Sequence, residues 1–172
     1  VGAALGRARE RVAGIVFTHL HDDHVQGIAA LCRTSARPIE AMLPSGQAEH
    51  PYYLTRGGLR TVETSPCLHV TRLPAAPQID LPGFPGVGVV AAAGHTPGSQ
   101  LVVVRLGDQA ARPIVLAGDI ANLRAGIERN VPKPWFYRLL VVPEDQAVTK
   151  AGEFLSAILL SGDASLSESF SL

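Results

Sequence analysis

The sequence predicts one mixed α/β domain, and three observations support that class. At 172 residues the chain is long enough to bury one substantial core and short for two. Hydrophobic residues make up 47% and charged residues 17%, which is typical of a globular protein. Short apolar runs rich in β-branched residues alternate with helical patterns and turn residues. We expect the domain to cover residues 1–160, with a disordered tail over residues 161–172.

The first half of the chain is predicted to alternate helices and strands. Residues 3–11 are rich in Ala and Arg and resemble the end of a helix, and the apolar run 12–17 predicts a buried strand. The elements that we expect next are a helix over residues 25–31, a strand over 38–43, a helix from Ser45 to about Leu54, and strands over 61–64 and 68–73.

In the second half of the chain, prolines predict loops and apolar runs predict strands. Four prolines break residues 73–88 into loop and edge pieces. Three apolar runs that follow predict strands of one sheet, and a last pattern after Pro143 predicts a long helix. The strands are expected at residues 87–93, 100–106 and 113–117, and the helix at 144–160.

Four metal-capable side chains fall directly after the first predicted strand, in the segment His19-Leu20-His21-Asp22-Asp23-His24. Side chains alternate along an extended chain, so His19 and His21 point to the same side and can bind one metal. Asp23 and His24 follow where the chain turns towards a helix, and they can face a second metal. Imidazole and carboxylate groups suit Zn²⁺ best, with Fe or Mn as alternatives. The other interpretation, a solvated polar loop, is disfavoured by this specific spacing.

Two further candidate ligands stand just beyond later predicted strands. His95 lies in the segment Gly94-His95-Thr96-Pro97-Gly98-Ser99, and Asp119 ends the segment Leu116-Ala117-Gly118-Asp119. The glycines permit tight turns and Pro97 fixes φ, so His95 is expected on a stiff loop. We expect Thr96 or Ser99 to support a ligand through a hydrogen bond.

With these three motifs in this order, the chain resembles the metallo-β-lactamase superfamily of metallohydrolases, and within it the lactonase and glyoxalase II-like members. The resemblance covers about residues 12–119. It implies an αββα sandwich, and relative to the family the N-terminal strands and the C-terminal end are expected to be incomplete. It also implies a first metal held by His19, His21 and His95, a second held by Asp23 and His24, and Asp119 as the bridge between them.

The resemblance further implies a zinc-dependent hydrolase that cleaves a small ester, thioester or lactone. Two metals roughly 3.5–4 Å apart can share a hydroxide that attacks the carbonyl carbon, and Asp23 is the expected catalytic residue that orients it. The family normally supplies one more histidine late in the chain, whereas no histidine follows His95. We therefore expect the second metal to bind more weakly.

Two alternatives to the hydrolase remain open. One is a mononuclear iron oxygenase similar to persulfide dioxygenases, which share the fold and use fewer ligands. The other is an incomplete, inactive domain that binds metal without turnover. Iron with oxygen consumption would indicate the first, and zinc without turnover would indicate the second.

The charge, the hydrophobicity and the cysteine content limit which partners and which cellular compartment we expect. Fifteen basic and fifteen acidic residues cancel, so we expect a small-molecule substrate and no nucleic acid. No apolar run reaches the roughly 18 residues that a membrane span needs, so no membrane partner is expected. Two cysteines cannot form a disulfide framework, and we assign Cys32 to the core and Cys67 to a loop. A cytoplasmic location is expected, and the sequence does not predict an oligomeric state.

Overall fold

The structure is a computed structural model that describes residues 10–33, 35, 37–49, 55–93, 95–107 and 112–120. The chain divides into two compact units, Val1–Ala75 and Ala76–Leu172, and the described residues of each unit form one β-sheet. The mixed α/β class predicted from the sequence is confirmed. The single domain over residues 1–160 stays a prediction. The helix predicted over 144–160, the tail over 161–172 and most of the helix over 3–11 lie outside the described residues.

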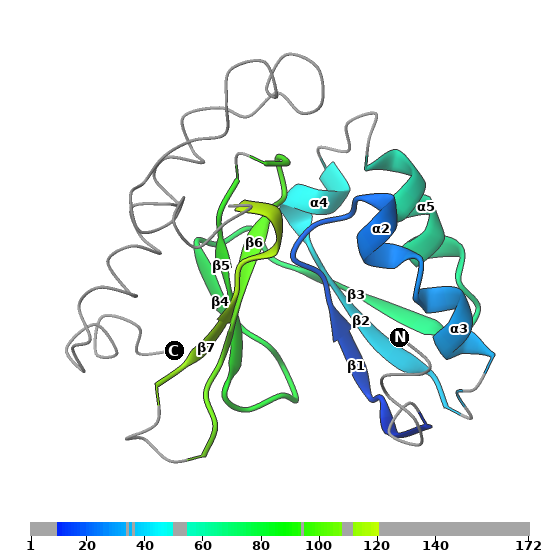
Figure 1. Cartoon of the computed structure of the whole chain (residues 1–172), viewed down its shortest axis with the longest axis horizontal. Helices are drawn as coiled ribbons and strands as arrows, with labels where there is room; N and C mark the ends of the chain where they lie inside the picture. Colours follow the sequence, from blue (N-terminus) through cyan, green and yellow to red (C-terminus); the bar gives the residue numbers. More distant parts are fainter. Residues whose placement is uncertain are drawn as a thin grey trace. The chain divides into compact units, whose positions relative to one another are not determined.

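The sheet of the first unit has three parallel strands in the order β1-β2-β3. These are β1 (Gly14–Val16), β2 (Ile39–Pro44) and β3 (Leu68–Leu73), and Ala41 pairs with both Ile15 and Val70. Parallel neighbours need crossover connections, which are helical here. The first crossover holds α2 (Asp22–Val25) and α3 (Ile28–Cys32), and the second holds α4 (Ser45–Glu49) and α5 (Arg56–Thr64). Figure 1 shows α2, α3 and α5 on one face of this sheet.

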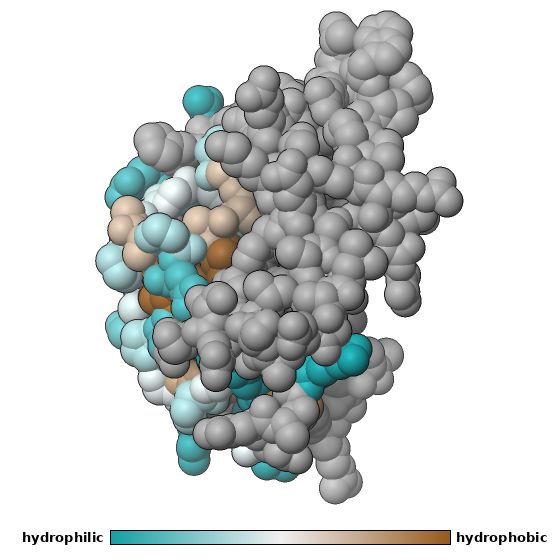
Figure 2. Space-filling model, turned by 90° about the vertical axis from the view of Figure 1, so that its left-hand side faces the viewer, coloured by the Kyte–Doolittle hydropathy of each residue, from teal (hydrophilic) through white to brown (hydrophobic). Residues whose placement is uncertain are grey.

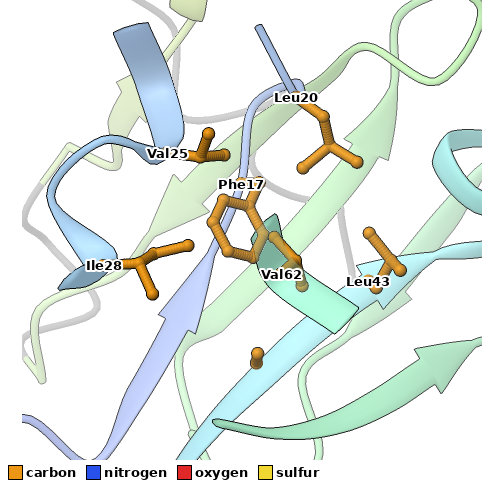
Figure 3. Close-up of a cluster of buried hydrophobic side chains, with 7 residues drawn as sticks. Phe17, Leu20, Val25, Ile28, Leu43 and Val62 are labelled. Carbon is orange, nitrogen blue, oxygen red and sulfur yellow. The ribbon is translucent and has the colours of Figure 1, made fainter. Parts of the chain in front are cut away.

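The core of the first unit forms where the helices meet the sheet. Figure 3 shows the Phe17 ring surrounded by side chains from the sheet and from three helices. The buried residues of the cluster are Phe17, Leu20, Val25, Ile28, Ala41, Leu43 and Val62. Burying a large apolar side chain contributes about 1.5–3 kcal/mol to folding. Phe17 and Leu20 flank Thr18 and His19 in the sequence, so the core anchors the histidine-rich segment on both sides of its first histidine.

Two of the predicted elements in this unit were wrong. The single helix predicted over residues 25–31 is two short helices, α2 and α3, with Gln26 and Gly27 between them, and glycine is a poor helix former. The strand predicted over 61–64 is the end of α5. Thr61 Oγ1 donates to Gly57 O at 3.0 Å and Thr64 Oγ1 to Arg60 O at 2.8 Å, so both β-branched residues bond back to the helix. A four-residue window is too short to separate the two periodicities.

A disulfide joins Cys32, the last residue of α3, to Cys67, which directly precedes β3. The Cα atoms lie 5.2 Å apart, and 35 positions separate the two cysteines in the sequence. Cys67 lies in the turn before β3, as expected from the sequence, but its pairing with Cys32 was not predicted. The sequence shows no local sign of the pairing, because it depends on the parallel sheet bringing the end of α3 beside the start of β3.

The sheet of the second unit is antiparallel and follows sequence order. It contains β4 (Gln78–Asp80), β5 (Val87–Ala91), β6 (Gln100–Val104) and β7 (Ile114–Leu116). The three predicted strands are therefore present, and β4 is an edge piece within the proline-rich stretch. Ala92 and Leu101 are buried together, packed by apolar residues of β5 and the β7 region. This sheet fixes the positions of the two segments that carry His95 and Asp119.

Strand β7 carries apolar side chains that remain accessible. Ile114 is 48% exposed and Leu116 is 50% exposed, while Val115 between them packs against the core cluster. Brown apolar and teal hydrophilic residues are mixed over the described surface in Figure 2. Among the described residues, no helix is long and apolar enough to cross a membrane.

Candidate metal centre

The loop that follows β1 brings two histidine rings into contact. His19 is 1% exposed, and its Nε2 lies 3.1 Å from Nδ1 of His21. The ring centroids are 4.7 Å apart and the rings stand nearly perpendicular to each other, at 85°. On the other side of the ring, His19 Nδ1 lies 3.3 Å from the Thr18 hydroxyl. Both nitrogens of His19 therefore face a polar partner, and one of those partners is a second imidazole.

The chemistry of this histidine pair fits a metal ion. If the Thr18 oxygen accepts a hydrogen bond from Nδ1–H of His19, then His19 Nε2 carries a lone pair directed at His21. Two imidazole nitrogens bound to one tetrahedral Zn²⁺ at about 2.0–2.1 Å lie roughly 3.3 Å apart. The observed separation of 3.1 Å is close to that value. Two facing lone pairs repel each other unless a proton or a cation is shared, so the arrangement suits cation binding.

His24 and Asp23 lie at the start of α2, beside this pair. The His24 ring centroid is 3.9 Å from that of His19, and the backbone N–H of His24 donates to His21 O at 3.0 Å. His24 Nε2 lies 3.7 Å from Asp23 Oδ2, and the Asp23 side chain is 70% exposed. The structure thus brings all three histidines of the motif together. Asp23 is the most open of the four predicted ligands in this unit.

His95 and Asp119 are paired in the second unit. His95 Nε2 lies 3.7 Å from Asp119 Oδ2, with the His95 side chain 4% exposed and that of Asp119 40% exposed. His95 lies in the turn between β5 and β6, and Asp119 follows β7. Gly118 has a φ of 56°, which a side chain disfavours, and it turns the chain just before Asp119. Residues from two separate turns therefore meet at one end of this sheet.

The turn that carries His95 is closed by its own polar side chains. The backbone N–H of Thr96 donates to Ser99 Oγ at 2.9 Å, and the two side-chain oxygens are also 2.9 Å apart. Ser99 N–H donates to Thr96 O at 3.1 Å, and both side chains are buried. These hydrogen bonds close the turn that the sequence predicts, and its stiffness stays a prediction. Direct support of a metal ligand by Thr96 or Ser99 stays a prediction.

A comparison with known protein families identifies the family of the chain. Residues 2–159 match the family described as the metallo-beta-lactamase superfamily. The chain belongs to this superfamily. No curated protein matches the sequence. Membership in the metallo-beta-lactamase superfamily confirms the resemblance drawn from the three motifs.

Several solved structures share the fold of the chain. An N-acyl homoserine lactone hydrolase with a product bound at its catalytic metal centre matches 93% of the chain at 18% identity, with a TM-score of 0.64. A quorum-quenching N-acyl homoserine lactone lactonase matches with the same values. A probable metal-dependent hydrolase from Staphylococcus aureus is 13% identical over 88% of the chain, with a TM-score of 0.55. The chain spans 56%, 60% and 52% of these three proteins, respectively.

The remaining described histidine lies apart from the motif. His69 of β3 is 69% exposed, and its Nδ1 lies 2.8 Å from Glu40 Oε1 of β2. The hydrogen bond with His69 is the main reason that the pKa of Glu40 lies below its usual value, and the Thr71 hydroxyl also donates to this carboxylate. His69 is thus a surface residue of this sheet. His50 lies outside the described residues.

Two residues beside the motif were missed by the sequence analysis. Gln47 of α4 donates hydrogen bonds to the backbone just before His19, and Gly58 of α5 lies against the backbone of Leu20. The adjacent glycines at positions 57 and 58, inside a helix, were a usable signal, because glycine disfavours helix and usually marks a close approach. No local pattern singles out Gln47.

Proposed function

We propose that the chain is a metal-dependent hydrolase that uses Zn²⁺ to cleave a small ester, thioester or lactone. The observation that carries the proposal is the His19–His21 pair, whose ring nitrogens lie 3.1 Å apart while Thr18 lies against the far nitrogen of His19. Histidine is a common zinc ligand, and a ligating histidine usually has a hydrogen-bond partner that orients its ring. Membership in the metallo-beta-lactamase superfamily supports the same conclusion.

In this proposal the six predicted residues are ligands for two metal ions, as the family resemblance implies. His19, His21 and His95 would hold the first metal, Asp23 and His24 would hold the second, and Asp119 would contribute its carboxylate to both. The match to the superfamily, over residues 2–159, includes all six positions. The second position is proposed to bind more weakly, because one histidine would hold it, whereas three histidines would hold the first.

The side chains have distinct roles in the proposed reaction. Bound Zn²⁺ would supply Lewis acidity and would lower the pKa of a coordinated water molecule towards neutrality. The Thr18 hydroxyl, 3.3 Å from His19 Nδ1, would orient the His19 ring. Asp23, with its 70% exposed carboxylate, is the group proposed to orient the attacking water and to take up its proton.

A small carbonyl compound is the proposed substrate, and a lactone is favoured because two of the solved structures with this fold are lactone hydrolases. The balanced charge argues for a small molecule over nucleic acid. The cytoplasmic location stays a prediction. The Cys32–Cys67 disulfide favours an oxidising compartment, because such bonds rarely persist in the cytosol.

Metal analysis combined with turnover of a panel of lactones, thioesters and esters tests the proposal. We expect bound zinc, and hydrolysis that falls by at least about 100-fold in the His21→Ala variant. The matched control is His69→Ala, which removes an exposed histidine of the same unit and should leave both zinc and turnover unchanged. One iron per chain with oxygen consumption would replace the hydrolase by an oxygenase. Zinc without turnover of any member of the panel would indicate a metal-binding domain that is not an enzyme.

A further inference from the structure

The segment from Phe17 to Leu20 is held by two residues that are poor metal ligands. Gln47 comes from α4, which directly follows β2, and Gly58 comes from the first turn of α5. Carboxyl ends of parallel strands meet at one edge of a sheet, so α4 begins at the same edge as the loop that follows β1. Both residues contact backbone atoms of the segment that carries the two histidines.

Gln47 binds the backbone immediately before His19. Its Nε2 donates to Phe17 O at 3.4 Å and to Thr18 O at 3.3 Å. The residue is 4% exposed, and its Oε1 is buried without a hydrogen-bond partner. A buried acceptor without a partner costs about 1–3 kcal/mol, so an apolar residue would make the fold more stable at this position. The carboxamide of Gln47 is therefore better explained by the hydrogen bonds from its Nε2 to the carbonyl groups of Phe17 and Thr18 than by a gain in the stability of the fold.

Gly58 lies against the backbone between the two histidines. A Cβ atom at this position would lie 2.0 Å from Leu20 O and 2.9 Å from Leu20 C, so the backbone would have to move. Glycine inside a helix costs about 0.5–1 kcal/mol relative to alanine. Leu20 is the residue between His19 and His21, and a shift of its carbonyl would turn both rings. The absence of a side chain at position 58 thus sets how closely α5 approaches the ligand segment.

We propose that Gln47 and Gly58 are positioning residues that fix the orientation of His19 and His21 for metal binding. Gln47 fixes the carbonyl groups on the amino-terminal side of His19, and Gly58 sets the position of the carbonyl between the two histidines. This inference rests on the proposed metal site. Partners that orient metal ligands typically change metal affinity by about 10–100-fold, and we expect losses of that size.

The first test compares two alanine substitutions in one helix turn. Gly58→Ala should lower Zn²⁺ affinity by at least about 10-fold in chelator competition. Gly57→Ala is the matched control, since a Cβ there meets only the Asp22 side chain, at 2.8 Å from Oδ1, and that exposed side chain can move. It brings the same gain in helix propensity and should bind Zn²⁺ within about twofold of wild type. Equal affinity of both folded variants would overturn the role of Gly58.

The second test remains decisive if Gly58→Ala does not fold. Gln47→Met keeps the side-chain length and removes both the donor and the unpartnered oxygen. We expect the metal-free variant to unfold at the same temperature as wild type or higher, while Zn²⁺ affinity falls about 10-fold and the visible spectrum of bound Co²⁺ changes. A merely structural role would change the unfolding temperature and leave the Co²⁺ spectrum intact.

Metal binding by wild type and by the Gln47→Met variant distinguishes a failure of the positioning role from a failure of the proposed metal site. Wild type that binds Zn²⁺ and Co²⁺, with a Gln47→Met variant that binds them equally well, would overturn the positioning role alone. Wild type that binds neither metal would overturn both the metal site and the positioning role.

Discussion

The two groups of proposed ligands are built in different ways. In the first unit, four ligands fall within six consecutive positions, and their histidine rings touch each other beside the core residues Phe17 and Leu20. In the second unit, His95 and Asp119 come from separate turns of an antiparallel sheet and meet as a single pair at 3.7 Å. The first group depends on local spacing and on one loop. The second depends on the register of several strands.

The largest expected effect comes from removing one histidine from each group. We expect His95→Ala to lower Zn²⁺ affinity by more than about 100-fold, because the proposed first position loses one of three nitrogen ligands. His24→Ala should remove only the weaker position, so the tighter zinc remains. Equilibrium dialysis with metal analysis measures both. If His24→Ala proves the more damaging variant, the assignment of the two positions must be exchanged.

The first unit is also stabilised by the Cys32–Cys67 disulfide. Removing this disulfide should have the next largest effect, on the free energy of unfolding. Closing a loop of 35 residues corresponds to roughly 4 kcal/mol in the chain-entropy model. We expect the double variant Cys32→Ser, Cys67→Ser to lose about 2–4 kcal/mol of unfolding free energy in a denaturant titration. Zn²⁺ affinity of the folded variant should stay within about twofold of wild type. A large loss of affinity at low denaturant would show that the disulfide also positions the ligands.

A smaller effect is expected from the turn that carries His95. Ser99→Ala removes the acceptor of the Thr96 N–H group and leaves this buried donor without its partner. The expected cost is about 1–3 kcal/mol of stability, together with weaker Zn²⁺ binding because His95 is less firmly held. Ser65→Ala is the control, since it removes a hydrogen bond to Thr61 O at the end of α5. The control should leave metal affinity unchanged, and a matching loss in both variants would count against a specific role of the turn.

The smallest effect concerns the Glu40–His69 pair, which belongs to neither group. The hydrogen bond with His69 lowers the pKa of Glu40, so this carboxylate contributes stability above its unfolded pKa and loses the contribution as the pH falls through its lowered value. The stability difference between wild type and Glu40→Gln should therefore be fully present above the unfolded pKa of glutamate, about 4.3, and should be lost as the pH falls through the lowered folded pKa. Acid titrations of unfolding measure this difference. A constant difference across the acid range would exclude the pair as its source.

The sequence was most informative where function depends on neighbouring residues. The spacing of His19, His21 and His24 predicted a shared site, and the structure brings their rings together. The strands of the antiparallel sheet were also predicted, because each is a short apolar run between turn residues. Residues 61–64 were misassigned, because threonine and valine favour strands unless side-chain bonds and packing hold them in a helix.

Contacts between segments that are distant in the sequence could not be predicted from local sequence patterns. The Cys32–Cys67 bond requires knowledge that α3 ends beside the start of β3. The contact of Gln47 with residues Phe17 and Thr18 requires knowledge that α4 begins at the edge where β1 ends. Both contacts follow from the parallel order of three strands, which no single segment specifies.

The disulfide has a consequence for how the first unit responds to its surroundings. It lies at the edge where β2 and β3 begin, and the histidine loop lies at the edge where β1 ends. A strand the length of β2 or β3, six residues, separates the two edges by about 20 Å. A reductant would therefore act at one edge of this small sheet, and a chelator of the proposed metal would act at the opposite edge. Reduction is expected to affect the stability of the unit, whereas loss of the proposed metal is expected to affect its activity.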